Sequence, residues 1–308
     1  MRNIFVSTSS YAEHSKKPLQ ILKSKGYRIN LNTNGRKLSS KELFNIIETY
    51  DGVIAGTEEY NKHIIDKAKN LKVISRLGVG LDNIDINYAE ERDIKIFKTN
   101  TTPAMAVAEL SLAMILSLLR CVTIHDNDLR NMKWEKNMGS LLYSKTIGII
   151  GLGTIGKTLV EITKGFNLKY FACDIFKDYD FADKHNVQYK KLEYLLSHSD
   201  VISIHLSYSK DLKNLIDKDR LNLMKSNSII INTSRGGIIN ETDLKNALSS
   251  GTIAGAGLDV FSEEPYFGQL KNSKNVILTP HIGSYAKEIR VKMEMEAAEN
   301  LILGFDNG

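Results

Sequence analysis

Three charged residues follow apolar, strand-like runs in the second half of the chain. Arg235 comes after "IIINTS", Glu264 after "AGAGLDV" and His281 after "NVILTP". Ligands of open α/β sheets bind beyond the carboxyl ends of the strands, so we expect the three side chains to converge at one crevice. A guanidinium can hold a carboxylate and polarise the neighbouring carbonyl, while a protonated imidazole can donate a proton. Together these residue types suit the reduction of a 2-keto acid, with Glu264 stabilising and orienting the imidazole.

Each of the three residues also has an ordinary structural interpretation. Arg235 could be an arginine of a surface loop, Glu264 a solvated acid before a proline, and His281 a histidine in a turn. The stretch "LTPHIGSY" favours a functional role for His281, because Pro280 fixes one backbone angle and Gly283 permits unusual ones. A backbone constrained on both sides can aim an imidazole.

A glycine-rich turn follows the apolar run "TIGII". Gly151, Gly153 and Gly156 have G-x-G-x-x-G spacing between a predicted strand and a predicted helix, the context of a dinucleotide site. The amides at the start of such a helix bind a pyrophosphate. Asp174 ends the next predicted strand, "YFACD", where its carboxylate would bind the ribose hydroxyls and favour NAD over NADP. An S-adenosyl ligand is the alternative, since glycine-rich turns also bind it.

The composition is that of a globular protein with a sizeable core. The 308 residues are 42% hydrophobic and 25% charged, which predicts two domains. The net charge is +5, but lysines are scattered among acids, which argues against a nucleic-acid partner. Only two cysteines occur and the N-terminus lacks a signal-peptide pattern, so we expect a cytoplasmic protein. The longest apolar run, 104–119, contains Glu109 and is too short for a membrane span, so we expect no membrane partner; no metal-ligand pattern stands out.

Short apolar runs alternate with amphipathic segments along the chain. This alternation predicts an α/β fold with parallel sheets in two Rossmann-like or flavodoxin-like domains. The long apolar helix near 104–120 separates the two halves, and a serine cap predicts a helix within 39–50. The final segment, 286–305, is strongly helical, but the sequence does not show which half it packs on.

The chain resembles the D-isomer-specific 2-hydroxyacid dehydrogenases over essentially its whole length. The matching segments are "SRLGVGLDNID" (75–85), "VAEL" (107–110), "KTIGIIGLGTIG" (145–156), "INTSRGG" (231–237), "GLDVFSEEP" (257–265) and "LTPHIGS" (278–284). The chain departs from the family at Ile175, where a proline is common, and at Ser207, where "HLP" is common.

The resemblance implies a role for each matching residue. Arg235 would bind the substrate carboxylate and carbonyl, and His281 with Glu264 would form the acid/base pair. Substrate binding is implied for the amides of Val79 and Gly80, and the neighbouring Arg76 could meet a phosphate or simply support its loop. Cofactor contacts are implied for Gly151, Gly153, Thr154, Ile155, Gly156, Asp174, Thr233 and Asp259, the last at the nicotinamide amide.

The resemblance also implies the architecture. A flavodoxin-like catalytic domain of residues 1–99 and 284–308 would contain an inserted NAD-binding Rossmann domain of residues 100–283. Closure of the cleft between the domains would exclude water from the hydride path. Family members are usually dimers joined through the cofactor domain and its long helix, so we expect a homodimer.

The substrate stays open between two kinds of acid. The chain is similar to short 3-phosphoglycerate dehydrogenases, whose substrate pair is 3-phosphoglycerate and 3-phosphohydroxypyruvate, and to reductases of glyoxylate or hydroxypyruvate. The stretch "GTEEY" (56–60) has two acids where some phosphoglycerate enzymes have a phosphate-binding arginine, which weakens the phosphorylated substrate. Formate dehydrogenases have glutamine in place of Glu264. The alternative from another class is an NAD(H)-sensing, corepressor-like protein without enzymatic activity.

Overall fold

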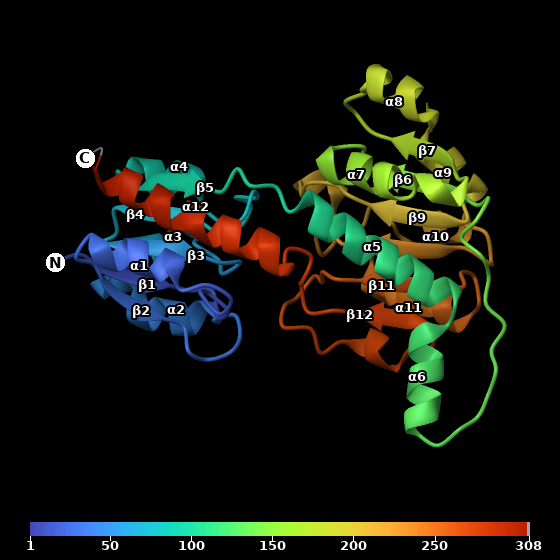
Figure 1. Cartoon of the computed structure of the whole chain (residues 1–308), viewed down its shortest axis with the longest axis horizontal. Helices are drawn as coiled ribbons and strands as arrows, with labels where there is room; N and C mark the ends of the chain where they lie inside the picture. The colour runs from blue at the N-terminus through green and yellow to red at the C-terminus, as the bar shows by residue number, and fades with distance from the viewer. Residues whose placement is uncertain (307–308) are drawn as a thin grey trace. The chain divides into compact units, whose positions relative to one another are not determined.

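A computed structural model describes residues 1–306 as two compact units (Figure 1). The first unit comprises Met1–Thr102 and the segment that begins at Tyr285, and the second comprises Pro103–Ser284. The polypeptide therefore leaves the first unit once and returns to it after the second is complete.

The first unit contains a five-stranded parallel sheet with strand order β2-β1-β3-β4-β5. This is the order of flavodoxin-like sheets. The strands are β1 (Asn3–Val6), β2 (Arg28–Leu31), β3 (Gly52–Ala55), β4 (Val73–Arg76) and β5 (Lys95–Lys98). The helices are α1 (Lys17–Ser24), α2 (Ser40–Ile46), α3 (Lys62–Lys67), α4 (Ile86–Glu91) and α12 (Lys287–Asp306), with a 3-10 turn η1 (Ile47–Thr49).

A local sequence signal accounts for the start of α2, whereas packing between distant segments accounts for the position of α12. The Ser39 hydroxyl accepts a hydrogen bond from the Glu42 amide, and the Glu42 carboxylate accepts one from the Ser39 amide, so the predicted serine cap is confirmed. Figure 1 shows α12, in red, lying among the blue elements of the first unit, where it packs on β3, β4, β5 and α1. The returning helix thus closes one face of the first sheet.

The second unit contains a seven-stranded parallel sheet with strand order β12-β11-β10-β9-β6-β7-β8. The strand order reverses at β6, as in dinucleotide-binding sheets. The strands are β6 (Thr146–Ile150), β7 (Lys169–Cys173), β8 (Val187–Tyr189), β9 (Val201–Ile204), β10 (Ile229–Asn232), β11 (Gly255–Leu258) and β12 (Val276–Leu278). The helices are α5 (Ala104–Leu119), α6 (Val122–Arg130), α7 (Thr154–Ile162), α8 (Tyr179–His185), α9 (Leu192–His198), α10 (Lys218–Asn222) and α11 (Glu241–Ser249), with 3-10 turns η2 (Lys164–Phe166), η3 (Lys210–Leu212) and η4 (Gln269–Asn272). Two parallel sheets with interleaved helices confirm the predicted α/β fold.

The apolar run of the sequence forms α5, which packs on α7, β10 and β11. Met114 and Ile115 of this helix are buried in a core shared with β6 and β10. No single helix within residues 1–306 is long and apolar enough to cross a membrane. The pair α5 and α6, bent by 66°, passes that test by length and composition alone, and half of α5 is buried in the core.

Candidate active site

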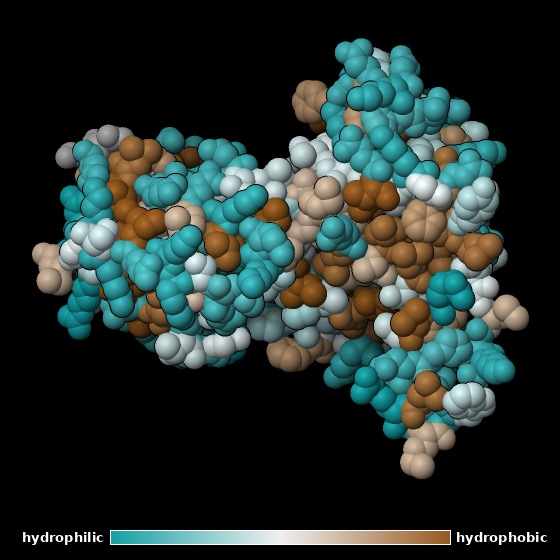
Figure 2. Space-filling model, in the orientation of Figure 1, coloured by the Kyte–Doolittle hydropathy of each residue, from teal (hydrophilic) through white to brown (hydrophobic). Residues whose placement is uncertain are grey.

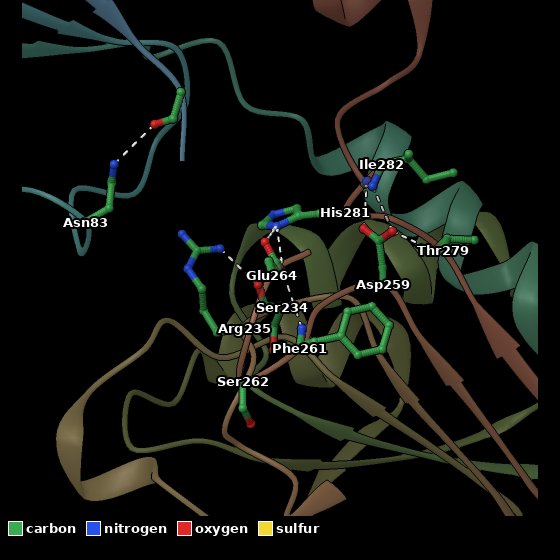
Figure 3. A network of polar contacts seen from close by, with 12 residues as sticks. Asn83, Ser234, Arg235, Asp259, Phe261, Ser262, Glu264, Thr279, His281 and Ile282 are labelled. Atoms are coloured by element: carbon green, nitrogen blue, oxygen red, sulfur yellow. Dashed lines mark hydrogen bonds and ion pairs between the residues drawn. The ribbon is translucent and has the colours of Figure 1, made fainter. Parts of the chain in front are cut away.

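A histidine and a carboxylate form the centre of the site in the second unit. His281 Nδ1 lies 3.0 Å from Glu264 Oε2 and 3.1 Å from Glu264 Oε1 (Figure 3). The His281 side chain is 33% exposed and the Glu264 side chain 18%. Glu264 Oε1 also accepts a hydrogen bond of 3.2 Å from the Phe261 amide, which fixes the carboxylate. The imidazole is therefore held through Nδ1, and Nε2 is the ring nitrogen on the side away from Glu264.

The backbone at His281 differs from the expectation in one respect. We expected Gly283 to take the unusual backbone angle, but the left-handed residue is His281 itself, with φ of 56°. A non-glycine residue with positive φ is uncommon and needs support from its surroundings. Gly283 instead leaves little space for a side chain, because a Cβ there would lie 3.1 Å from Asp259 Oδ2.

Asp259 supplies the support for this turn. Its Oδ1 accepts hydrogen bonds from the Thr279 hydroxyl at 2.6 Å and the Ile282 amide at 2.8 Å, and its Oδ2 accepts one from the Gly283 amide at 2.7 Å (Figure 3). The residue is fully buried, and burial raises the pKa of its carboxyl group despite these three donors. Both oxygens thus bind the turn on either side of His281, a positioning role that sequence reasoning missed; the predicted nicotinamide contact of Asp259 stays a prediction.

Arg235 lies in a loop that meets the loop of Glu264. The Asn232 side chain donates to the Arg235 carbonyl at 2.9 Å, and Arg235 Nη1 donates to the Ser234 carbonyl at 2.9 Å. A Cβ at Gly236 would lie 1.8 Å from the Phe261 carbonyl oxygen, so only glycine lets the two loops approach this closely. Figure 3 shows the Arg235 guanidinium directed toward the side on which Glu264 and His281 lie. The carboxyl ends of β10, β11 and β12 therefore bring the three predicted residues to one edge.

The glycine-rich turn has the geometry of a dinucleotide site. A Cβ at Gly151 would lie 2.6 Å from the His205 carbonyl oxygen, and one at Gly156 would lie 2.5 Å from the Gly151 carbonyl oxygen. Nothing lies within 4 Å of a Cβ at Gly153, where a ligand could approach the backbone. Gly153 is the N-cap of α7 and provides no side-chain cap, and Thr154 is exposed while Ile155 is half-buried. The first amides of α7 are therefore suited to a pyrophosphate.

Asp174 borders this turn, and Thr233 follows the end of β10. Asp174 Oδ2 accepts a hydrogen bond of 2.7 Å from the Leu152 amide, and its Oδ1 accepts one of 2.9 Å from the Phe176 amide. The carboxylate is thereby fixed beside the glycine-rich turn, where a ribose would lie. The Thr233 hydroxyl lies 2.9 Å from the Ser111 hydroxyl of α5 and is buried. These residues fit NAD.

The predicted substrate residues Val79, Gly80 and Arg76 belong to the first unit. Val79 is 41% exposed, and among the described residues neither its amide nor that of Gly80 donates to another group. Arg76 is buried; its Nη1 donates to the Leu77 carbonyl and its Nε donates to Asn83 Oδ1 at 3.3 Å. These contacts fit the loop-supporting interpretation of Arg76.

Within residues 1–306, no three His, Cys, Asp or Glu side chains lie close enough together to hold a metal ion. His205, whose carbonyl oxygen lies beside Gly151, is buried, and its Nε2 lies 2.9 Å from the Ser203 hydroxyl. Its Nδ1 has no hydrogen-bond partner within the described part of the chain. In the sequence, His205 lacks the neighbouring proline and glycine that marked His281 as a candidate.

Comparisons with known proteins agree with this geometry. Residues 112–283 match the model of the D-isomer-specific 2-hydroxyacid dehydrogenase NAD-binding domain. A glyoxylate reductase of Thermococcus litoralis is 39% identical over 256 residues, covering 80% of this chain and 77% of the relative. A D-3-phosphoglycerate dehydrogenase of Synechocystis sp. is 35% identical over 268 residues, or 86% of this chain, which spans about half (48%) of that relative's length. The crystal structure of D-lactate dehydrogenase from Aquifex aeolicus, complexed with NAD and lactic acid, matches with a TM-score of 0.83 and 26% identity over 99% of this chain and 96% of that one. The chain belongs to the D-isomer-specific 2-hydroxyacid dehydrogenase family.

Proposed function

We propose that the protein is an NAD-dependent D-2-hydroxyacid dehydrogenase that reduces a small 2-keto acid. The observation that carries the proposal is the His281–Glu264 pair, at 3.0 Å, on the sheet edge that also carries the Arg235 loop and the dinucleotide turn. Glyoxylate reductases and D-3-phosphoglycerate dehydrogenases among its relatives act on acids of this class.

The residues divide the reaction between them. Bound NADH supplies the hydride. Arg235 binds the substrate carboxylate with two hydrogen bonds and polarises the adjacent carbonyl. His281 donates a proton from Nε2 to the carbonyl oxygen, while Glu264 at Nδ1 balances the charge of the imidazolium and keeps the ring oriented. Asp259 holds the turn on which His281 sits.

Cofactor and substrate binding extend this proposal to the other predicted residues. The amides at Gly153, Thr154 and Ile155 bind the pyrophosphate, Asp174 binds the ribose, and Thr233 and Asp259 border the nicotinamide. Val79 and Gly80 offer two amides to a substrate carboxylate. The open N-terminus of α7 and the fixed Asp174 carboxylate support the cofactor assignments.

The test is NADH consumption with glyoxylate, hydroxypyruvate, pyruvate and 3-phosphohydroxypyruvate, repeated with NADPH. We expect turnover with at least one of these acids and a preference for NADH, because Asp174 would repel a 2′-phosphate. No turnover with any acid, together with retained NADH binding, would contradict the proposal and favour the NAD(H)-sensing alternative.

We further propose a cytoplasmic homodimer that uses the second unit. The segment 131–143, which follows α6, has no helix or strand and exposes Trp134 (82%) and Met138 (98%). Figure 2 shows apolar side chains gathered over α5 of the same unit. Exposed apolar patches of this kind mark protein interfaces. Both cysteines are free, which suits a reducing compartment.

Light scattering during size exclusion at micromolar concentration tests the assembly. We expect the mass of two chains for the wild type and of one chain for Trp134→Asp. A monomeric wild type would contradict the dimer without affecting the assigned chemistry.

A further inference from the structure

The loop 174–178 leads from β7 to α8 and carries the Asp174 carboxylate. Its middle residues contribute little to the core, because Ile175 is 88% exposed and Phe176 is 82% exposed. Ile175 also leaves its backbone angle φ free, which a proline would not. A segment with so few buried apolar contacts has little stability of its own. The position of Asp174 therefore depends on polar contacts at the two ends of the loop.

The first end of the loop is held by Asp174 itself. Its Oδ2 accepts a hydrogen bond from the Leu152 amide of the glycine-rich turn at 2.7 Å, and its Oδ1 accepts one from the Phe176 amide at 2.9 Å. A carboxylate oxygen can accept more than one hydrogen bond, so both oxygens keep room for ribose hydroxyls. Of the two bonds, that from Phe176 lies within the loop, and only that from Leu152 ties this end to the turn.

The second end of the loop is held by Asp178. Its Oδ1 accepts a hydrogen bond from the Phe181 amide at 3.0 Å and thereby caps α8, while its Oδ2 accepts one from the Lys157 ammonium group of α7. The Asp178 amide donates to the hydroxyl of Tyr189, the last residue of β8, at 2.9 Å. Asp178 therefore joins the loop to α7, α8 and β8.

Lys157 belongs to the helix that begins at the glycine-rich turn. It lies about one turn after Gly153, the N-cap of α7. Its Nζ lies 5.3 Å from the centre of the Phe181 ring, so it faces the start of α8. The hydrogen bond from Lys157 holds the pKa of the Asp178 carboxyl group below its usual value. Because α7 also offers its first amides to a pyrophosphate, this ion pair ties the 174–178 loop to the pyrophosphate-binding helix.

We infer that Lys157 and Asp178 are positioning residues for the cofactor, whose ion pair holds the 174–178 loop where Asp174 binds the ribose. The inference rests on the proposed function, in which Asp174 has this role. A loop that is ordered before binding loses less conformational entropy on binding, so the ion pair raises cofactor affinity without touching the cofactor. Direct attraction of the pyrophosphate by Lys157 is the competing explanation. It predicts that removing the charge of Asp178 strengthens binding, whereas the positioning role predicts that binding weakens.

The experiment measures ADP-ribose binding by isothermal titration calorimetry, since this ligand contains the pyrophosphate and the ribose but needs no hydride transfer. We expect Lys157→Met to raise Kd about three- to fivefold, the upper range for a partly exposed ion pair. Asp178→Asn should also raise Kd, because asparagine still caps α8 but offers Lys157 no charge. The double variant should bind no more weakly than Lys157→Met, because two residues that act through one contact are not additive.

Lys164→Met is the matched control. It removes an exposed lysine just after the end of α7 and changes the net charge by the same amount. Its Kd should stay within about twofold of the wild type. A second readout separates positioning from general damage to the fold. In Lys157→Met the KM for NADH should rise by the same factor as the Kd of ADP-ribose, while kcat at saturating NADH stays unchanged.

Three results would overturn the inference, with the melting temperature as the check on folding. The first is an unchanged Kd in a folded Lys157→Met. The second is unchanged or tighter binding by Asp178→Asn, which decides the matter even where Lys157→Met does not fold. The third is an equal loss of affinity in Lys164→Met, which would reduce the effect to net charge.

A failure of the proposed function gives a different result. If the wild type binds ADP-ribose but reduces no keto acid, the comparison of Kd values still decides the role of Lys157 and Asp178. If the wild type reduces a keto acid and Kd is the same in all variants, the dehydrogenase assignment stands and the positioning role fails. A wild type that does not bind ADP-ribose would overturn both the inference and the cofactor assignment of Asp174.

Discussion

Two histidines stand at strand ends of the same sheet and differ in every property that matters for proton transfer. His281, after β12, is one-third exposed, is bonded through Nδ1 to Glu264 and has a left-handed backbone. His205, after β9, is buried, and within residues 1–306 the Ser203 hydroxyl is the only hydrogen-bond partner of its ring. Burial lowers the pKa of His205 to about 4. A histidine at a strand end is therefore not an acid/base group by position alone.

The difference lies in the neighbours. Glu264 can compensate a proton on His281, and solvent exposure leaves room for a substrate at Nε2. No carboxylate among the described residues is hydrogen-bonded to His205, so its ring stays neutral and serves packing beside Gly151. The following changes test this contrast, beginning with the largest expected effect.

Replacing each histidine by glutamine should separate the two roles. We expect His281→Gln to lower kcat at least about a thousandfold, because the proton donor is lost. His205→Gln should change kcat by less than about tenfold. Steady-state NADH oxidation measures both, and NADH binding by fluorescence serves as the control for folding. Comparable losses in the two variants would contradict the contrast.

Acid should destabilise the protein through His205. Its folded pKa of about 4 lies below the unfolded value of 6.5, so the stability it contributes is present above pH 6.5 and is lost as the pH falls toward 4. The loss between pH 7.5 and 4 amounts to about 3 kcal/mol. The free energy of unfolding, measured with urea at several pH values, should therefore fall by about 3 kcal/mol less in His205→Gln than in the wild type. If the free energy of unfolding changed equally with pH in the two proteins, the role of His205 in acid sensitivity would be refuted.

Removing the charge that supports His281 should have an intermediate effect. Glu264→Gln keeps the shape but weakens the stabilisation of the imidazolium, so we expect kcat to fall by about 10- to 100-fold, or about 1.4 to 2.7 kcal/mol. NADH affinity should hardly change, because the glycine-rich turn is separate from Glu264. A variant with wild-type kcat would remove Glu264 from the acid/base pair.

The smallest effect is expected at the turn itself. In Gly283→Ala the new methyl group would lie 3.1 Å from Asp259 Oδ2 and 3.3 Å from Val107 Cγ2, so the turn must shift by a few tenths of an ångström. We expect about 1 kcal/mol of lost stability and a severalfold lower kcat. Thermal unfolding and kcat in the same preparation measure the two effects. A stability loss without any change in kcat would show that the turn does not aim His281.

The sequence was sufficient for the parts of the fold that depend on local patterns. Alternating apolar and amphipathic segments predicted the parallel sheets, and Ser39 with Glu42 predicted a helix start. The strand ends predicted that Arg235, Glu264 and His281 would meet, because parallel strands end at the same edge. The residue pattern of the last helix did not say where α12 packs; only the family resemblance assigned residues 284–308 to the first domain.

The parts that the sequence missed depend on contacts between distant residues. Asp259 was assigned to the cofactor, yet its oxygens bind the turn of His281 more than 20 residues later. Gly283 was expected to have the unusual backbone angle, whereas in the structure His281 has the positive φ and Gly283 lies tightly against Asp259.

The most direct test of the central claim is hydride transfer itself. Hydroxypyruvate would be reduced with NADH that carries two deuterium atoms at C4 of the nicotinamide, and the product analysed by mass spectrometry and chiral chromatography. The assignment of Arg235, Glu264 and His281 to a D-2-hydroxyacid dehydrogenase predicts the D-isomer of glycerate with one deuterium at C2. A product without deuterium at C2, or the L-isomer, would contradict it.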